Sequence, residues 1–258
     1  MNLLEAIIFG VVEGITEFLP VSSTGHLILT AKVLGNSQTE FLKSFEIIIQ
    51  LGAILAIVVL YGASLLRKIE VWKRVIVAFL PTAVIGCIFY KIIKHTLLGN
   101  HHIVLWSLFW GGVFLIIFDC LHKEKDTSIE EIVNIPYRTA ILIGLFQSFA
   151  MVPGVSRSAA TIIGGLMCNI RRKTIVEFSF LLAIPTMLAS TGWDVIKSAH
   201  DFVPEQLIFL GTGFVVSFIV AIFSVRFLLY FVQRHNFIVF GIYRMILPVV
   251  WWIWERGL

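Results

Sequence analysis

Charged side chains are scarce in this sequence. Asp, Glu, Lys and Arg make up only 14% of its 258 residues, whereas 58% of the residues are hydrophobic. Soluble domains usually carry about 25% charged residues. The shortage of charge therefore excludes an ordinary soluble domain and indicates a chain whose main solvent is lipid.

Cysteine is also rare. Cys87, Cys120 and Cys168 lie far apart, each within an apolar stretch or at the end of one. Metal-binding cysteines usually come in closely spaced pairs, so we interpret these three as packing residues. The net charge of +4 is not gathered into a basic and aromatic patch, and we expect no nucleic-acid partner.

A cleavable signal is missing from the N-terminus. The first residues contain no basic segment, and Glu5, Glu13 and Glu17 interrupt the apolar run that a signal peptide needs. We therefore expect the N-terminus to belong to the mature fold.

Long apolar runs are what the sequence has in abundance. A helix that crosses a bilayer needs about 20 mostly apolar residues, and several stretches meet this requirement. The predicted spans are Phe45 to Leu66, Val75 to Ile93, Ile103 to Leu121, Phe178 to Val195, Leu207 to Tyr230 and Phe237 to Trp254.

Two related motifs lie outside these spans. The segment from Gly10 to Gly25 aligns with the segment from Gly144 to Ala159, at an offset of about 134 residues. The alignment pairs Glu13 with Gln147, Ser22 with Ser156 and Ser23 with Arg157, while Pro20 and Pro153 are one place out of register. The two halves of the chain therefore look duplicated.

Each motif interrupts an apolar region with proline and clustered hydroxyl residues. Because proline removes a backbone donor, the freed groups at membrane depth must be buried in protein or line a wet cavity. We predict re-entrant helical hairpins over residues 3–33 and 139–167, in an all-α polytopic membrane protein with six transmembrane helices. The chain is then a single membrane domain, 1–258, with repeats 1–121 and 139–254, each a hairpin plus three spans.

An odd number of crossings per repeat inverts the second repeat relative to the first. Most basic loop residues then fall on one side, which the positive-inside rule makes cytoplasmic. They are Arg67, Lys68, Lys73, Arg74, Lys123, Lys125, Arg138, Arg171, Arg172, Lys173, Arg226 and Arg234, against Lys32, Lys43, Lys94 and Lys197 opposite. Both termini are therefore predicted to lie outside.

Two acids and a run of hydroxyls form the first candidate site. Glu13 and Glu17 share one helical face, and as candidate metal ligands they suit a divalent cation, Mg²⁺ or Ca²⁺. The alternative is an amphipathic helix whose acidic face contacts water.

Ser22, Ser23 and Thr24 begin a half-helix whose backbone amides attract an anion. The alternative is that one of them is a plain N-cap. His26 follows Ser23 by three residues, within reach as its base.

The second motif places Arg157 in an apolar region, where an arginine is costly unless it meets an anion. Its guanidinium matches phosphate oxygens; the alternative is a structural arginine on helix carbonyls. Ser156, Ser158 and Thr161 are further candidate hydrogen-bond donors to a bound phosphate, or alternatively they cap the half-helix. Arg244, inside the last predicted span, is a further substrate-binding candidate that could equally snorkel or pair with a carboxylate.

The other histidines receive no functional role. His101 and His102 are adjacent but lack a supporting carboxylate cluster in the sequence, and the others lie in predicted loops or near span ends. They are His95, His101, His102, His122, His200 and His235.

The segments Glu13 to His26 and Pro153 to Thr161 closely resemble the two signature motifs of the bacitracin-resistance family of undecaprenyl-diphosphate phosphatases. Similar stretches run from Ile49 to Ala56, Glu177 to Pro185 and Phe240 to Arg244, so the resemblance covers the whole chain. Ala159 departs from the glycine usual in the family, which affects fine geometry only.

The resemblance implies metal-assisted hydrolysis of undecaprenyl diphosphate to undecaprenyl phosphate, which recycles the lipid carrier for peptidoglycan and other wall polymers. It implies a multi-pass protein of the bacterial inner membrane with its site facing the periplasm or outer side. Membrane lipid and the lipid diphosphate are the expected partners, and a homodimer is left open. Glu13, Glu17, Ser23, His26 and Arg157 match the family's functional positions.

Our hypothesis is that Ser23 attacks the terminal phosphorus with His26 as base. Glu17, a metal and Arg157 would complete the catalytic set by stabilising charge. His26 as direct nucleophile, and a water oriented by either residue, remain open. The rival function is transport by a lipid-phosphate flippase or anion carrier, whose inverted repeats look alike; a carrier, however, needs no nucleophile.

Overall fold

The computed structural model describes residues 1–37, 39–62, 68–92, 101–198 and 204–257. Within these ranges the chain is helical and contains no strand, apart from an isolated bridge between Ile129 and Ile170. The helices are α1 Leu3–Thr16, α2 Ser23–Val33, α3 Glu40–Tyr61, α4 Ile69–Ile92, α5 His101–Leu121, α6 Tyr137–Ser148, α7 Arg157–Met167, α8 Arg172–Ser198, α9 Pro204–Phe231 and α10 Ile238–Gly257, with short 3₁₀ turns at Ile132–Asn134 and Phe149–Met151.

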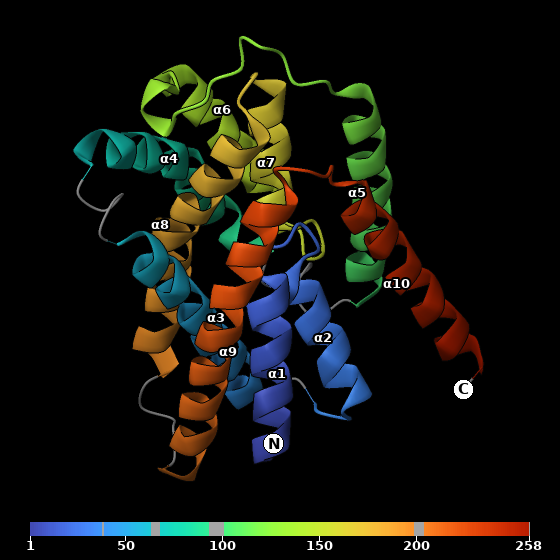
Figure 1. Ribbon diagram of the computed structural model, residues 1–258. Coiled ribbons are helices and arrows are strands. Elements are labelled where there is room, and N and C mark those ends of the chain that lie inside the picture. The colour runs from blue at the N-terminus through green and yellow to red at the C-terminus, as the bar shows by residue number, and fades with distance from the viewer. Residues whose placement is uncertain (38, 63–67, 93–100, 199–203, 258) are drawn as a thin grey trace.

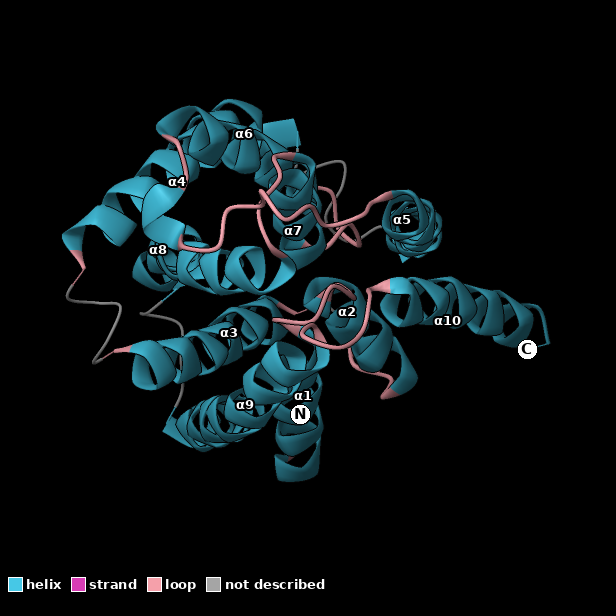
Figure 2. Ribbon diagram, turned by 45° about the horizontal axis from the view of Figure 1, so that its top comes forward, coloured by secondary structure: helices cyan, strands magenta, loops and turns pink. Residues whose placement is uncertain are grey.

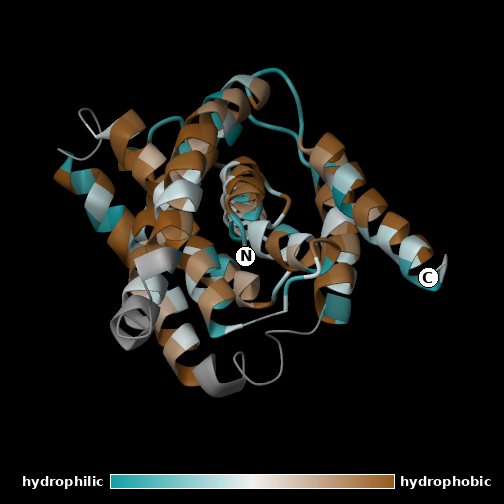
Figure 3. Ribbon diagram, turned by 90° about the horizontal axis from the view of Figure 1, so that it is seen from below, coloured by the Kyte–Doolittle hydropathy of each residue, from teal (hydrophilic) through white to brown (hydrophobic). Residues whose placement is uncertain are grey.

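Six of the described helices, α3, α4, α5, α8, α9 and α10, are long and apolar enough to cross a membrane, as predicted. Their outward faces carry exposed Leu, Ile, Phe and Trp side chains, and apolar residues dominate the helices in Figure 3. Exposed apolar surface on so many long helices is typical of contact with lipid. The all-α multi-pass fold is therefore confirmed. The predicted span ends Leu66 and Ile93 lie outside the described residues.

Helix α3 begins at Glu40, five residues before its predicted start at Phe45. The Thr39 side chain accepts a hydrogen bond from the backbone N–H of Leu42, so a local N-cap extends the helix beyond its apolar run. A hydropathy criterion misses this extension because the first turn contains polar residues.

Each predicted interrupted region consists of two short helices, α1 with α2 and α6 with α7. Helices α2 and α7 both follow a serine with a positive φ, 72° at Ser22 and 78° at Ser156. The hydroxyl oxygen of each serine accepts the N–H three residues on, from Gly25 and from Ala159. Non-glycine residues rarely adopt this backbone conformation, so its occurrence at both aligned positions marks two matched turns.

The helix pairs pack in a related way in the two halves. Helix α1 lies along α9, α6 lies along α4, and α5 and α10 lie side by side next to α2 and α7 (Figures 1 and 2). Glycines allow the close approaches: a Cβ at Gly14 would come within 2.7 Å of the Ser217 oxygen on α9, and one at Gly144 would overlap the Ala78 oxygen on α4. Small residues commonly allow membrane helices to touch in this manner.

Gly144→Ala tests the approach of α6 to α4. The added methyl group would overlap the Ala78 carbonyl oxygen, so we expect the free energy of unfolding to fall by about 1–3 kcal/mol, the usual cost of overpacking. Gly211→Ala on α9 is the matched control, because a Cβ there meets nothing within 4 Å. Thermal unfolding in detergent measures both, and equal midpoints for the two variants would contradict this packing.

Candidate active site

A cavity of about 210 Å³ lies where the two interrupted regions meet. Six predicted site residues from both motifs line it, which places polar groups distant in sequence around one space. They are Glu17, Ser22, Ser23 and Thr24 from the first motif and Ser156 and Arg157 from the second. The starts of α2 and α7 both face this cavity, and helix N-termini favour bound anions.

Glu17 connects the two motifs. The Ser23 hydroxyl donates to Glu17 Oε2 at 2.6 Å, and Arg157 Nη2 donates to Glu17 Oε1 at 3.2 Å. The pair is largely buried, with 12% of the Arg157 side chain and 6% of the Glu17 side chain exposed. Buried charges are costly unless paired, so a hydroxyl, a carboxylate and a guanidinium are held together beside the cavity.

Helix α8 holds Arg157 from the other side. Arg157 Nη1 donates to the Ser179 carbonyl oxygen at 2.8 Å, and the Ser179 hydroxyl lies 2.6 Å from that of Thr161. Arg157 Nε is buried and has no hydrogen-bond partner among the described residues. The guanidinium is therefore fixed in place with a donor left over.

Glu13 is the residue that best fits a cation. Its side chain is fully buried, and neither of its carboxylate oxygens has a hydrogen-bond partner within the described parts of the chain. It interacts electrostatically with the carboxyl groups of Glu17 and Glu46 and with Arg157, although it does not line the cavity. A buried carboxyl beside a second carboxyl group, that of Glu17, is costly unless a proton or a cation lies between them, and carboxylate oxygens are ligands that Mg²⁺ and Ca²⁺ prefer. Glu13 and Glu17 therefore suit the predicted divalent cation.

The structure does not form the predicted Ser23–His26 pair. His26 Nδ1 lies 2.7 Å from the Ser22 carbonyl oxygen, one turn back, and Nε2 lies 2.7 Å from the Tyr243 hydroxyl. The imidazole is stacked on Tyr243 with an interplanar angle of 6°. Ser23 opens α2 and turns back toward Glu17, whereas His26 points toward α10, so the two side chains diverge.

Ser158 and Thr161 do not line the cavity. The Ser158 hydroxyl donates to the Leu19 carbonyl oxygen at 2.8 Å and thereby ties the start of α7 to the first motif. The Thr161 hydroxyl lies within 3.0 Å of the carbonyl oxygens of Arg157 and Ser158 as well as the Ser179 hydroxyl. Both residues support the walls of the cavity instead of facing it.

Arg244 was predicted to contact the substrate, but in the structure its side chain contacts backbone carbonyl oxygens. The side chain is fully buried and donates to the carbonyl oxygens of Pro20 at 3.1 Å, Val155 at 2.9 Å and Gly154 at 2.9 Å. Two longer contacts reach carbonyls of α5. Gly111 on α5 makes room, because a Cβ there would overlap the guanidinium. The arginine binds both motif turns at once.

Four polar residues near the site were missed from the sequence. Gln50 on α3 and Ser190 on α8 line the cavity, Ser179 on α8 holds Arg157, and Tyr243 on α10 holds His26. Each is a polar side chain within a predicted apolar span. A second signal was that Gln50, Ser179 and Tyr243 each lie in one of the further stretches that resemble the family. Neither signal reveals which distant motif the residue meets.

The fold and the cavity define an all-helical multi-pass membrane protein with a buried polar site at the junction of two broken-helix motifs. The chain belongs to the family described as bacitracin resistance protein BacA, which matches residues 6–250. This confirms the resemblance found in the sequence.

Curated relatives agree with that membership. A protein of Persephonella marina is 52% identical over 97% of this chain and 98% of its own length. One of a Sulfurihydrogenibium species is 51% identical over 98% and 100%, and one of Aquifex aeolicus is 51% identical over 96% of each. All three are named undecaprenyl-diphosphatase.

Arg244→Lys tests whether Arg244 binds the motif turns or a ligand. A lysine ammonium cannot reproduce the fork of guanidinium donors, and each buried carbonyl left without a donor costs about 1–3 kcal/mol. We expect a lower melting temperature than for wild type, with Arg226→Lys, exposed on α9, as the unaffected control. An unchanged melting temperature together with weaker binding of inorganic phosphate would instead support the predicted substrate contact.

Proposed function

We propose that this protein hydrolyses undecaprenyl diphosphate to undecaprenyl phosphate and inorganic phosphate in the bacterial plasma membrane. It thereby recycles the lipid carrier for peptidoglycan and other cell-wall polymers and confers bacitracin resistance. Family membership over nearly the whole chain and relatives named undecaprenyl-diphosphatase support this function.

The observation that carries the proposal is the contact of Ser23 and Arg157 with the same carboxylate, Glu17. Phosphoryl transfer needs a positioned nucleophile and charge to stabilise the phosphate oxygens. The Ser23 hydroxyl supplies the first and the Arg157 guanidinium the second, and both residues line one cavity. A carrier of lipid phosphates would need the arginine but not the serine.

In the proposed reaction, Ser23 Oγ forms a bond to the terminal phosphorus and its proton passes to Glu17, which already accepts that hydroxyl. The anhydride P–O bond breaks, and its electrons leave with undecaprenyl phosphate. Arg157 pairs with the non-bridging oxygens of the transferred group. A water oxygen then bonds to the phosphorus, the P–O bond to Ser23 breaks, and Ser23 Oγ takes its proton back from Glu17. Inorganic phosphate leaves with both hydrogens of the water, which restores the hydroxyl and the carboxylate.

This assignment replaces His26 by Glu17 as the base for Ser23. The bonds of His26 to the Ser22 carbonyl and to Tyr243 favour a positioning role, since they hold the strained residue that precedes Ser23. Direct attack by His26, or by a water, would leave different covalent products. Quenching turnover with a labelled diphosphate and mapping any phosphorylated residue separates the three routes.

The same proposal includes a divalent cation, Mg²⁺ or Ca²⁺, held by Glu13 and Glu17. The unpartnered, buried oxygens of Glu13 support this ligand set. Such a cation would supply neutralisation of charge on phosphate oxygens. Glu17 retains its contacts with Ser23 and Arg157 through separate oxygens.

Phosphate release from a long-chain isoprenyl diphosphate tests the site. We expect Ser23→Ala, Glu17→Gln and Arg157→Lys each to lower kcat at least about 100-fold, the scale of losing a general base or charge stabiliser. His26→Ala should have a smaller effect, and a chelator should abolish release from wild type. Ser148→Ala is the control, because that hydroxyl bonds only the Gly144 carbonyl oxygen of its own helix.

Full release by Ser23→Ala, together with complete loss in His26→Ala and a trapped phosphohistidine, would overturn the serine route. If Arg157→Lys kept wild-type kcat and KM, the proposed phosphate contact would be wrong.

We also propose that residues 1–121 and 139–254 are inverted repeats, with re-entrant hairpins that enter from opposite sides of the membrane. The matched positive-φ turns at Ser22 and Ser156 and the related packing of α1 on α9 and α6 on α4 support the duplication. In Figure 1 the chain starts and ends toward the lower end, while the basic α5–α6 connection crosses the top. The positive-inside rule then puts both termini outside.

Labelling of single cysteines tests this orientation. In a background without Cys87, Cys120 and Cys168, we expect an impermeant maleimide on intact cells to label Ser37→Cys, in the exposed α2–α3 connection. Lys125→Cys, exposed in the α5–α6 connection, should react only after permeabilisation. The reverse pattern would invert the proposed topology, and labelling of both in intact cells would contradict it.

A further inference from the structure

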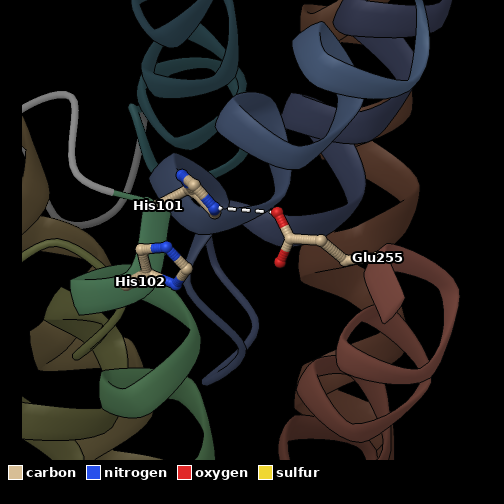
Figure 4. Close-up of side chains that lie close together, drawn as sticks. All are labelled: His101, His102 and Glu255. Atoms are coloured by element: carbon tan, nitrogen blue, oxygen red, sulfur yellow. Dashed lines mark hydrogen bonds and ion pairs between the residues drawn. The ribbon is translucent and has the colours of Figure 1, made fainter. Parts of the chain in front are cut away.

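The structure joins two histidines and a carboxylate that the sequence keeps far apart. His101 and His102 begin α5, and Glu255 lies near the end of α10 (Figure 4). One possible ligand atom from each lies within 4.8 Å of the others. In the sequence, His101 and His102 had no carboxylate nearby and were assigned no role. The structure supplies that carboxylate, Glu255, from the last helix.

The spacing suits a transition metal. Ligand atoms at about 2.0–2.1 Å from a tetrahedral Zn²⁺ are roughly 3.3 Å from one another, and His101 Nε2 lies 3.1 Å from Glu255 Oε1. Imidazole and carboxylate together are ligands for Zn²⁺, Co²⁺ and Ni²⁺. The all-oxygen pair Glu13 and Glu17 would favour harder cations instead.

A cationic group of the protein itself is held at this cluster. Lys32 Nζ, from the end of α2, donates to Glu255 Oε1 at 2.7 Å and lies 3.2 Å from His101 Nε2. The same His101 Nε2 lies 3.1 Å from Glu255 Oε1, so the imidazole, the carboxylate and the ammonium meet at one point. The carboxylate and the imidazole thus converge on a position already favourable to positive charge.

That ammonium is displaceable. The Lys32 and Glu255 side chains are 38% and 32% exposed, and exposed ion pairs contribute little to stability. Lys32 also lies over the Trp251 ring, 5.5 Å from its centroid, where it can remain while releasing the carboxylate. A metal with several ligands would hold the cluster more firmly than a single ammonium does.

We propose that His101, His102 and Glu255 form a second metal site, selective for a transition metal of the Zn²⁺ type, in which the metal replaces the Lys32 ammonium and links α5 to α10. The site is separate from the cavity lined by Ser23 and Arg157 and does not depend on the proposed phosphatase reaction.

Titration of the purified, tag-free, full-length protein with Co²⁺ tests the site, with excess Mg²⁺ present to occupy the oxygen site. The visible absorption of tetrahedral Co²⁺ reports binding, and Zn²⁺ should displace it. We expect His102→Ala and Glu255→Gln each to weaken binding at least about tenfold. His122→Ala, at the other end of α5, is the matched control and should bind as wild type does.

Lys32→Met provides the sharpest outcome. Removing the competing ammonium should tighten Co²⁺ binding several-fold, and a gain of affinity cannot arise from misfolding. The absence of saturable binding in wild type, equal affinity in the His102→Ala and Glu255→Gln variants, or weaker binding in Lys32→Met would each overturn the proposal.

Discussion

The backbone of the two interrupted helices is the constraint on which the site depends. A helix that stops inside an apolar region leaves carbonyl oxygens without partners, and each costs several kcal/mol away from water. Arg244, on the last helix, supplies donors to these oxygens. Its guanidinium donates to carbonyls of both turns, at Pro20, Gly154 and Val155. The two walls of the cavity are thereby fixed to each other by a residue that does not line it.

The turns at Ser22 and Ser156 share a backbone conformation but differ in the residue that follows. Ser22 and Ser156 adopt the same unusual φ and cap their helices in the same way. The next position holds a hydroxyl, Ser23, in one half and a guanidinium, Arg157, in the other. An equivalent geometry therefore presents two complementary groups to one carboxylate. This arrangement is what the proposed duplication, followed by divergence at one position, would produce.

The six long helices were predictable from the length of their apolar runs. The two interrupted regions were predictable from their prolines and clustered hydroxyl residues. The polar residues at the cavity were also recognisable, since Glu17 and Arg157 are costly in apolar surroundings. Their partners were not predictable. Ser23 lies near both Glu17 and His26 in sequence, and only the turn geometry selects Glu17. The supports for Arg157 and His26, at Ser179 and Tyr243, come from distant helices.

The ion pair between Glu17 and Arg157 has a further consequence for the proposed reaction. While no substrate is bound, Arg157 Nη2 is engaged by one oxygen of Glu17, whose other oxygen accepts the Ser23 hydroxyl. A diphosphate entering the cavity competes for the same guanidinium, which keeps its anchor on the Ser179 carbonyl and has Nε still unpartnered. As Arg157 turns toward phosphate, Glu17 keeps the Ser23 hydroxyl through Oε2. In the proposed reaction, substrate binding and the placement of the serine would therefore meet at one carboxylate.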